Sequence, residues 1–417
     1  MTYTVRSRGV VHVLLLALMM ACRGAADAKP APGPSRYLYV WAGTGDDTTR
    51  GIDMMTVIDA DPASSGYGTV RAALTLDSAG HMPHHTEFSA PPNGILAAND
   101  YSGDKSYLVD FRTPATPRLD GRLDPVPGGR RLHSFERLDN GHLLATVQFS
   151  TDSGTGHPGA LAEFDEHGKL LRTAWSRDSA FPGARIRTYA LAVVKSADRI
   201  VTTSSPMDNE TTADVVQVWR LSDLTLLKTL SVPVTAGDSA HKYPFEVRAL
   251  PDGSVMLNTY YCGFYRVSGI ETEQPRLDLV HALNEAHAEG CAVAVVMGHY
   301  WIVPAAFART IVSFDVSDPT HPVEVSRLQT DSTFYPHWLS TDPASDRIVV
   351  GSADGGAPRV LVARMDRTTG TLTWDERFHD AGSSRLGVDL DRPELRRGAA
   401  SHVMGHAALF GPAVATR

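Results

Sequence analysis

The feature that most constrains the fold of this chain is a hairpin pattern that recurs seven times. Each copy has an alternating apolar run, a short turn rich in Asp, Gly and Pro, and a second alternating run, as in "TIVSFDVSDPTHPVEVSRL". Period-2 alternation broken by such a turn predicts a β-hairpin. The turns of the copies begin at Asp59, Asp110, Asp165, Arg220, Val267, Asp315 and Asp366. Their spacing of 47 to 55 residues leaves room for two further short strands in each repeat.

A second segment recurs between the hairpins, for example "YPHWLSTDPASDRIVVGS". Its last copy, "ASHVMGHAALFGP", follows the last hairpin, whereas "RYLYVWAG" at 36–43 precedes the first one. Four-stranded units arranged radially form a β-propeller. The sequence therefore predicts an all-β, seven-bladed β-propeller as a single domain over 36–417. We expect strands from both ends of the chain to complete one blade, because that arrangement removes free sheet edges.

The first residues have the pattern of a leader. Two arginines precede an apolar run in "MTYTVRSRGVVHVLLLALMMACRGAADAKP", and a small-residue cleavage site follows it. This predicts a signal peptide over 1–28 and a short linker over 29–35. The apolar run is too short to cross a bilayer of about 30 Å, so no membrane span is expected. A lipid anchor at Cys22 is left open, and the mature chain is expected to be periplasmic or secreted.

Charge and cysteine content narrow the choice of partners. The formal net charge of −8 disfavours binding to nucleic acid phosphates. Outside the leader the chain has two cysteines, Cys262 and Cys291. They either form a disulfide or remain as two buried thiols.

Histidines recur at one position of the repeat. The first strand of a propeller blade lines the central axis, and the residues expected there are His84-His85, His133, Tyr189, Phe245-Glu246, Cys291, His337 and His402. A single histidine on a strand is usually solvated or satisfied by neighbours. Several neutral imidazoles that converge are instead a donor set suited to copper or zinc. We therefore predict a metal site on the axis, with His406 as the rival of His402 for the last ligand position.

Several motifs resemble those of the selenium-binding protein and methanethiol oxidase family. They are "PHHTEF", an "LH" strand, "PFEVR", "DVSDPTHP" and "AASHVM", in the family's order between about Tyr37 and Phe410. The resemblance implies a seven-bladed propeller and a secreted copper enzyme that oxidises methanethiol with dioxygen to formaldehyde, hydrogen sulfide and hydrogen peroxide. It implies that the copper ligands are His84, His85, His133 and His402, and it assigns the glutamate of the family's "PLEIR"-like strand to Glu246.

The chain also departs from the family pattern. No cysteine follows the histidine pair in "TEFSAPPNG", the C-terminal "MGHAALFGPAVATR" has none, and His337 is an additional imidazole. We therefore expect a copper-dependent oxidase that acts on a small thiol or related reduced compound with dioxygen, with Glu246 and His337 as acid–base residues. One alternative is a non-catalytic propeller that binds a protein or glycan. Another is a propeller lyase or hydrolase with histidine as general base.

Overall fold

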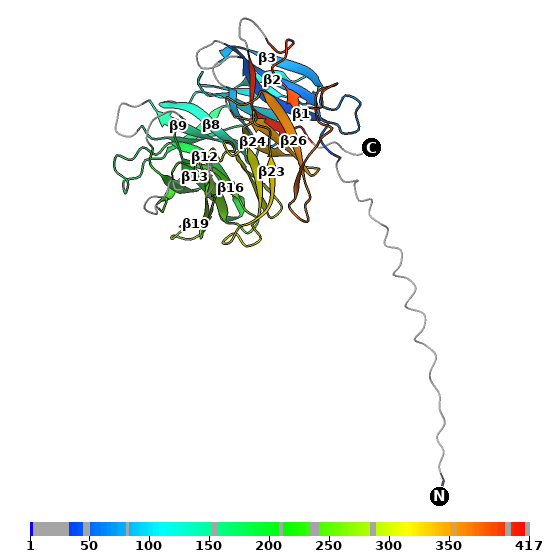
Figure 1. Ribbon diagram of the computed structural model, residues 1–417. Helices are drawn as coiled ribbons and strands as arrows, with labels where there is room; N and C mark the ends of the chain where they lie inside the picture. Colours follow the sequence, from blue (N-terminus) through cyan, green and yellow to red (C-terminus); the bar gives the residue numbers. More distant parts are fainter. Residues whose placement is uncertain are drawn as a thin grey trace.

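The computed structural model is an all-β propeller with seven blades around a central axis (Figure 1). It describes residues 1–2, 33–44, 51–80, 83–151, 157–207, 212–233, 242–283, 289–353, 355–396 and 402–412. The leader, Cys22 and most of the linker lie outside these ranges. The prediction of the fold class is confirmed. Among the described residues, no helix is long and apolar enough to pass through a membrane.

The strands of each blade are ordered from the axis to the rim. Blades 1 to 3 are β4 (Pro83–Thr86), β5 (Ile95–Asp100), β6 (Lys105–Asp110) and β7 (Arg118–Arg122); β8 (Gly129–Arg137), β9 (Leu143–Ser150), β10 (Ala160–Phe164) and β11 (Leu170–Trp175); β12 (Thr188–Val194), β13 (Arg199–Ser204), β14 (Val215–Arg220) and β15 (Leu226–Ser231). A 3-10 turn, η1 (Lys195–Ala197), follows β12.

Blades 4 to 7 continue in the same way. They are β16 (Pro244–Ala249), β17 (Val255–Thr259), β18 (Gly263–Ser268) and β19 (Arg276–Ala282); β20 (Val295–Met297), β21 (Tyr300–Ala305), β22 (Thr310–Asp315) and β23 (Val323–Gln329); β24 (Pro336–Thr341), β25 (Arg347–Ser352), β26 (Arg359–Met365) and β27 (Leu372–Trp374), with β28 (Val388–Asp389) paired to β26; and β29 (Val403–Phe410), β1 (Tyr37–Thr44), β2 (Gly51–Asp59) and β3 (Val70–Gly80).

Blade 7 joins the two ends of the chain, as the sequence predicts. Strand β29 pairs antiparallel with β1, so that Leu38 lies opposite Phe410. The neighbouring segment is fixed by Ser35, whose hydroxyl donates to the carbonyl of Gly411 at 2.6 Å. Asp342 accepts hydrogen bonds from Ser35 and from the buried Arg347 of blade 6. The ring is therefore closed by a strand pairing and by a buried polar network.

The apolar rows of the sequence pack between neighbouring blades. A second strand such as β5 is fully buried, whereas a rim strand such as β7 is largely exposed. Four tryptophans, Trp41, Trp219, Trp301 and Trp338, are fully buried between blades. Each inner strand contacts the inner strand of the next blade, and β29 contacts β4 to complete the ring. These contacts set the inner strands side by side around the axis.

Every inner strand carries one extra residue relative to its partner strand. The register shifts by one in six blades. In blade 5 the bridge Cys291↔Ala305 and the pair Val295↔Ile302 are offset by one as well. Such an insertion is a β-bulge, which changes the direction of a side chain. The bulges contain His84-His85, His133, Tyr189, Phe245-Glu246, His337 and His406.

Polar side chains of the second strand of a blade form hydrogen bonds with the bulge of the inner strand. Asn99 accepts a hydrogen bond from the backbone N–H of His85 at 2.6 Å and donates one to the carbonyl of Leu132 in the next blade at 2.6 Å. The hydroxyl of Thr146 likewise accepts a hydrogen bond from the backbone N–H of Ser134 at 2.9 Å and donates one to the carbonyl of Tyr189 at 2.7 Å. These residues satisfy backbone groups that a bulge leaves unpaired, and they also tie each blade to the next.

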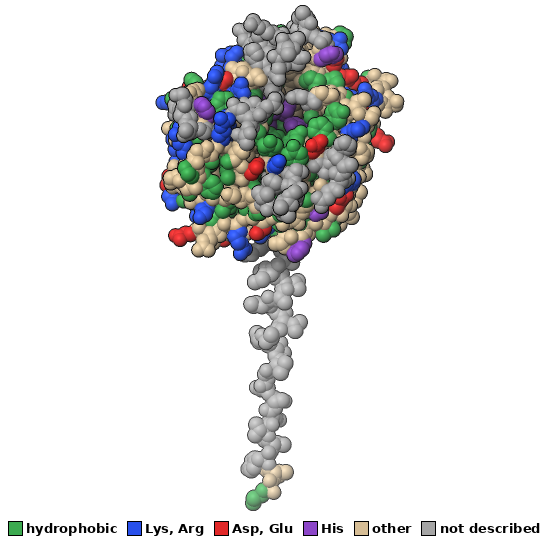
Figure 2. Space-filling model, turned by 60° about the vertical axis from the view of Figure 1, so that its left-hand side comes forward, with side chains coloured by type: hydrophobic (Ala, Val, Ile, Leu, Met, Phe, Trp, Pro, Cys, Tyr) green, Lys and Arg blue, Asp and Glu red, His purple; other side chains and the backbone are tan. Residues whose placement is uncertain are grey.

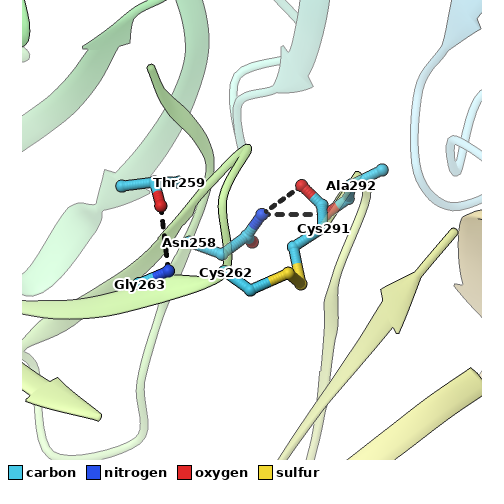
Figure 3. Close-up of a disulfide and its surroundings, with 6 residues drawn as sticks. All are labelled: Asn258, Thr259, Cys262, Gly263, Cys291 and Ala292. Atoms are coloured by element: carbon cyan, nitrogen blue, oxygen red, sulfur yellow. Dashed lines mark hydrogen bonds between the residues drawn. A yellow bond between two sulfur atoms is a disulfide. The ribbon is translucent and has the colours of Figure 1, made fainter. Parts of the chain in front are cut away.

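A disulfide joins blade 4 to blade 5 (Figure 3). Cys262 lies in the β17–β18 turn, and Cys291 lies at the start of the inner segment of blade 5; their Cα atoms are 5.2 Å apart. Asn258 donates to the carbonyl of Cys291 at 2.8 Å beside this bond. Of the two states that the sequence allows, the structure has the disulfide. Cys291 therefore has no free thiol to offer as a metal ligand.

Candidate metal centre

Four imidazoles from three inner strands converge at the axis. His84 and His85 come from β4, His133 from β8 and His406 from β29. The ring centres of His84 and His406 are 4.0 Å apart, and those of His85 and His133 are 4.1 Å apart. These side chains are almost completely buried. We call these four residues the histidine cluster; Figure 2 shows histidine side chains near the middle of one face, with hydrophobic side chains beside them.

Three members of the cluster are arranged as metal ligands. His84, His85 and His133 each offer a ligand atom, and these atoms all lie within 4.8 Å of one another. The Nε2 atoms of His84 and His133 are 3.0 Å apart. Two nitrogens bound to one tetrahedral ion at the usual bond length would be about 3.3 Å apart. The observed distance between the two Nε2 atoms is therefore close to that expected when both bind one metal ion.

Hydrogen bonds to neighbouring groups orient two of the rings. The Nδ1 atom of His133 lies 2.9 Å from the carbonyl oxygen of Tyr189, which can only accept, so Nδ1 carries the proton. This leaves the lone pair on Nε2, the atom that faces His84. The hydroxyl of Ser134 lies 3.2 Å from Nδ1 of His85 and 3.1 Å from Nδ1 of His133. Such outer contacts fix the ring orientation and tautomer of metal-binding histidines.

The cluster is electrically neutral. Burial is the main cause that lowers the pKa of His133 and His406 to about 3. Burial, followed by the neighbouring imidazoles, holds the pKa of His84 and His85 well below the usual value. A neutral imidazole has a lone pair for a metal ion, whereas an imidazolium has none. Burial therefore keeps these side chains in the form that binds metal.

Several ring nitrogens of the cluster have no hydrogen-bond partner within the described residues. They are Nδ1 of His84, Nε2 of His85, and both Nδ1 and Nε2 of His406. A buried polar atom without a partner costs about 1–3 kcal/mol. Nitrogen donors that are neutral, buried and free to bind suit a copper or zinc ion. The residues present therefore fit such an ion, with His84, His85 and His133 as donors and His406 next to them.

The structure corrects the assignment of His402. Its side chain is 68% exposed, and its Nδ1 lies 2.9 Å from the carboxylate of Asp391. His402 precedes β29, whereas His406 occupies the bulge of that strand, between the pairs Trp41↔Ala407 and Ala42↔Gly405. The bulge turns the His406 ring towards the axis. Blade 7 therefore contributes His406 to the cluster in place of His402.

The two expected acid–base residues have different surroundings. The ring of His337, which is half-buried, lies 4.7 Å from that of His406 at the edge of the cluster. Glu246 is fully buried, and its carboxylate accepts a hydrogen bond from Arg248 at 2.8 Å. Burial raises the pKa of Glu246, while Arg248 opposes that shift. The buried Glu87 accepts hydrogen bonds from Arg137 at 2.9 and 2.8 Å.

Sequence reasoning missed the groups that support the cluster. The edge of Trp338 faces His85, with ring centres 4.9 Å apart, and Trp338 stacks on Phe88. Ser134 and Asn99 hold the ring and the backbone of His85, respectively. Small polar residues next to a histidine are common in any strand. Only the position of Asn99, opposite the histidine pair in a neighbouring strand, is a signal that the sequence offers.

Comparison with known proteins gives the fold but no family assignment. No family model matches the sequence, and no curated protein matches it. Among solved structures, a hypothetical selenium-binding protein from Sulfolobus tokodaii is similar with a TM-score of 0.72 and 15% identity, over 93% of this chain and 96% of that chain. The likeness shows a common propeller.

Two enzymes with the same fold are also similar. The periplasmic gluconolactonase of Pseudomonas aeruginosa has a TM-score of 0.59 and 15% identity, over 89% of this chain and 99% of that chain. A catalytically inactive virginiamycin B lyase variant from Staphylococcus aureus has a TM-score of 0.52 and 10% identity, over 76% and 96%. Since one propeller fold supports different functions, the site must be argued from its own residues.

Proposed function

We propose that the histidine cluster binds copper and that the protein is a secreted oxidase, which oxidises a small thiol or related reduced compound with dioxygen. The observation that carries this proposal is the convergence of His84, His85 and His133, whose ligand atoms lie within 4.8 Å of one another in a buried site. The likeness to a selenium-binding protein agrees with the motif resemblance, although it extends only to the fold.

The residues of the chain have distinct roles in this proposal. Copper bound at the cluster would supply electron exchange with dioxygen and would favour the thiolate form of a bound thiol. Tyr189 and Ser134 hold His133 and His85 in the orientation that points their free nitrogens inwards. His337, whose ring lies 4.7 Å from that of His406, would accept the proton that the thiol loses. Glu246 is a second candidate for that role.

The proposed compartment is outside the cytoplasm. The disulfide between Cys262 and Cys291 supports this, because disulfides persist mainly in oxidising compartments. The leader pattern in the sequence supports it as well. A small-molecule substrate is proposed because the histidine cluster is buried.

A metal analysis combined with an oxygen-uptake assay tests the oxidase. Protein purified from the periplasm should contain about one copper ion per chain and should consume dioxygen when a small thiol is added. The double variant His84→Ala/His85→Ala should lose the copper and the activity, while Thr203→Val, a change in the bulge contacts of blade 3, should keep both. Stoichiometric copper in the double variant would refute the site.

A propeller hydrolase or lyase is the second candidate function. The supporting observation is His133, whose proton is held on Nδ1 by Tyr189, so that Nε2 is available as a general base. This function needs no metal. Hydrolysis of a lactone that persists after chelation, in protein without copper, would favour it over the oxidase. Absence of both metal and turnover would favour a non-catalytic binding propeller.

A further inference from the structure

Two arginines and two aromatic rings lie beside the histidine cluster, where blades 1 to 3 meet. The ring centre of Tyr101 is 5.6 Å from that of His84. The guanidinium carbon of Arg131 lies 5.0 Å from the Tyr101 ring centre. The sum of these two distances means that the guanidinium carbon of Arg131 is at most about 11 Å from the His84 ring centre. Positive charge is therefore available a short distance from the candidate metal centre.

Phe149 lies between the two arginines. The guanidinium carbons of Arg131 and Arg187 are 5.4 and 4.7 Å, respectively, from the centre of its ring. Arg187 is only 3% exposed, and Arg131 is half-buried. Guanidinium groups stack favourably on aromatic rings, which fixes their direction. The contact with Phe149 therefore helps to fix where the guanidinium of Arg131 points.

The backbone at Arg131 is held in an uncommon conformation. Its φ angle is 59°, in the left-handed region that glycine normally occupies. The N–H of Arg131 donates to the carboxylate of Asp104, which stabilises this conformation. Arg131 lies two residues before His133 on β8, and its left-handed backbone conformation also sets where the arginine side chain points. Strained backbone of this kind concentrates at binding and catalytic sites.

Within the described residues, no ion pair neutralises the charge of Arg131. No carboxylate in the described part of the chain forms an ion pair with its guanidinium, whereas the adjacent Arg130 pairs with Asp104 at 3.2 Å. Arginine binds carboxylates through two parallel hydrogen bonds, and the group is preorganised for that geometry.

We propose that Arg131 binds the carboxylate of an anionic substrate, and that the substrate class is a short thiol carrying a carboxylate. The thiol part of this inference rests on the proposed oxidase, whereas the anion site does not. The guanidinium of Arg131 lies within about 11 Å of the His84 ring centre, a distance that matches a bound carboxylate followed by two methylene groups and a thiol. A neutral thiol of the same length lacks this anchor.

A pair of matched thiols tests the substrate class. We expect kcat/KM in oxygen uptake to be at least tenfold higher for 3-mercaptopropionate than for 3-mercapto-1-propanol. Arg131→Gln should remove this preference by lowering kcat/KM for the acid alone, and Arg131→Lys should restore part of it. Arg130→Gln, which changes the neighbouring exposed arginine, should behave as the wild type. Equal rates for the two thiols in the wild-type protein would overturn the proposed class.

Binding of propionate, which has no thiol, tests the anion site without turnover. Calorimetry should show binding that weakens with added salt and becomes at least tenfold weaker in Arg131→Gln but not in Arg130→Gln. If no thiol is oxidised while this pattern holds, the oxidase is wrong and the anion site stands. If propionate binding is the same in both variants, the anion site is wrong, whatever the outcome for the oxidase.

Discussion

The side chain of Asn99 accepts a hydrogen bond from the backbone N–H of His85 at 2.6 Å, and this contact holds the histidine pair in its bulge. The same amide donates to the carbonyls of Leu132 and His133 at 2.6 and 3.3 Å. Asn99 thus links the backbones of β4 and β8, which carry three of the four clustered imidazoles. A residue that touches no ligand atom therefore controls how the two strands approach each other.

Replacing Asn99 with alanine should weaken both folding and metal binding. A lost buried hydrogen bond should lower the free energy of unfolding by about 1–3 kcal/mol. Misplaced ligands should lower metal affinity by about tenfold or more, as loss of outer contacts does in other metal sites. Denaturant unfolding and a competitive metal titration would measure the two effects.

Asn258→Ala is the matched control, because Asn258 donates to the carbonyl of Cys291 at 2.8 Å in the corresponding place between blades 4 and 5. It should lower the stability without changing metal affinity. A loss of affinity that is equal in the two variants would mean that Asn99 acts through general stability alone.

Replacing His406 should weaken metal binding, whereas replacing His402 should not. His406→Ala deletes a buried donor of the cluster, so we expect metal affinity to fall at least tenfold. His402→Ala removes an exposed ring that contacts Asp391, and we expect stability to change by no more than about 0.5 kcal/mol with metal binding unchanged. Metal titration of both variants decides between them. Metal loss on replacing His402 would show that His402 is a ligand after all.

Acid should destabilise the metal-stripped protein. His133 and His406 have folded pKa values of about 3, below the value near 6.5 expected in the unfolded chain. Between these limits the unfolded chain binds more protons than the folded protein, so the stability is complete above pH 6.5 and falls as the pH decreases towards 3. Each histidine should contribute a slope of about 1.4 kcal/mol per pH unit within that window.

Urea unfolding of the metal-stripped protein from pH 7.5 to 5 would measure this dependence. The variant His406→Gln provides the control, because glutamine does not titrate and the slope should decrease. If the slope were the same with and without His406, the titration of that buried imidazole would not be its source.

The disulfide should stabilise the seam between blades 4 and 5 without serving the metal. Its two cysteines are 29 residues apart, and closing a loop of that size is worth about 3–4 kcal/mol. Thermal or denaturant unfolding of Cys262→Ala/Cys291→Ala should show this loss. Because both sulfurs are bonded to each other, the double variant should keep its metal. Loss of the metal in a variant that remains folded would show that blade 5 supports the cluster.

The sequence by itself determined the fold, the number of blades and the closure by both ends of the chain. These features depend on alternation, turn residues and repeat spacing, which are local and occur in every copy. It also placed His84, His85 and His133 at the axial position, because each lies early in the inner segment of its blade.

The tertiary structure decided which imidazoles meet and what holds them. The number of strand residues before the bulge differs between blades: one in β4, four in β8 and three in β29. Counting along the chain therefore selects His402, although the strand pairing turns His406 inwards. The proton position on His133, the link through Asn99 and the stacking of Arg131 depend on contacts across blades, and strand alternation says nothing about these.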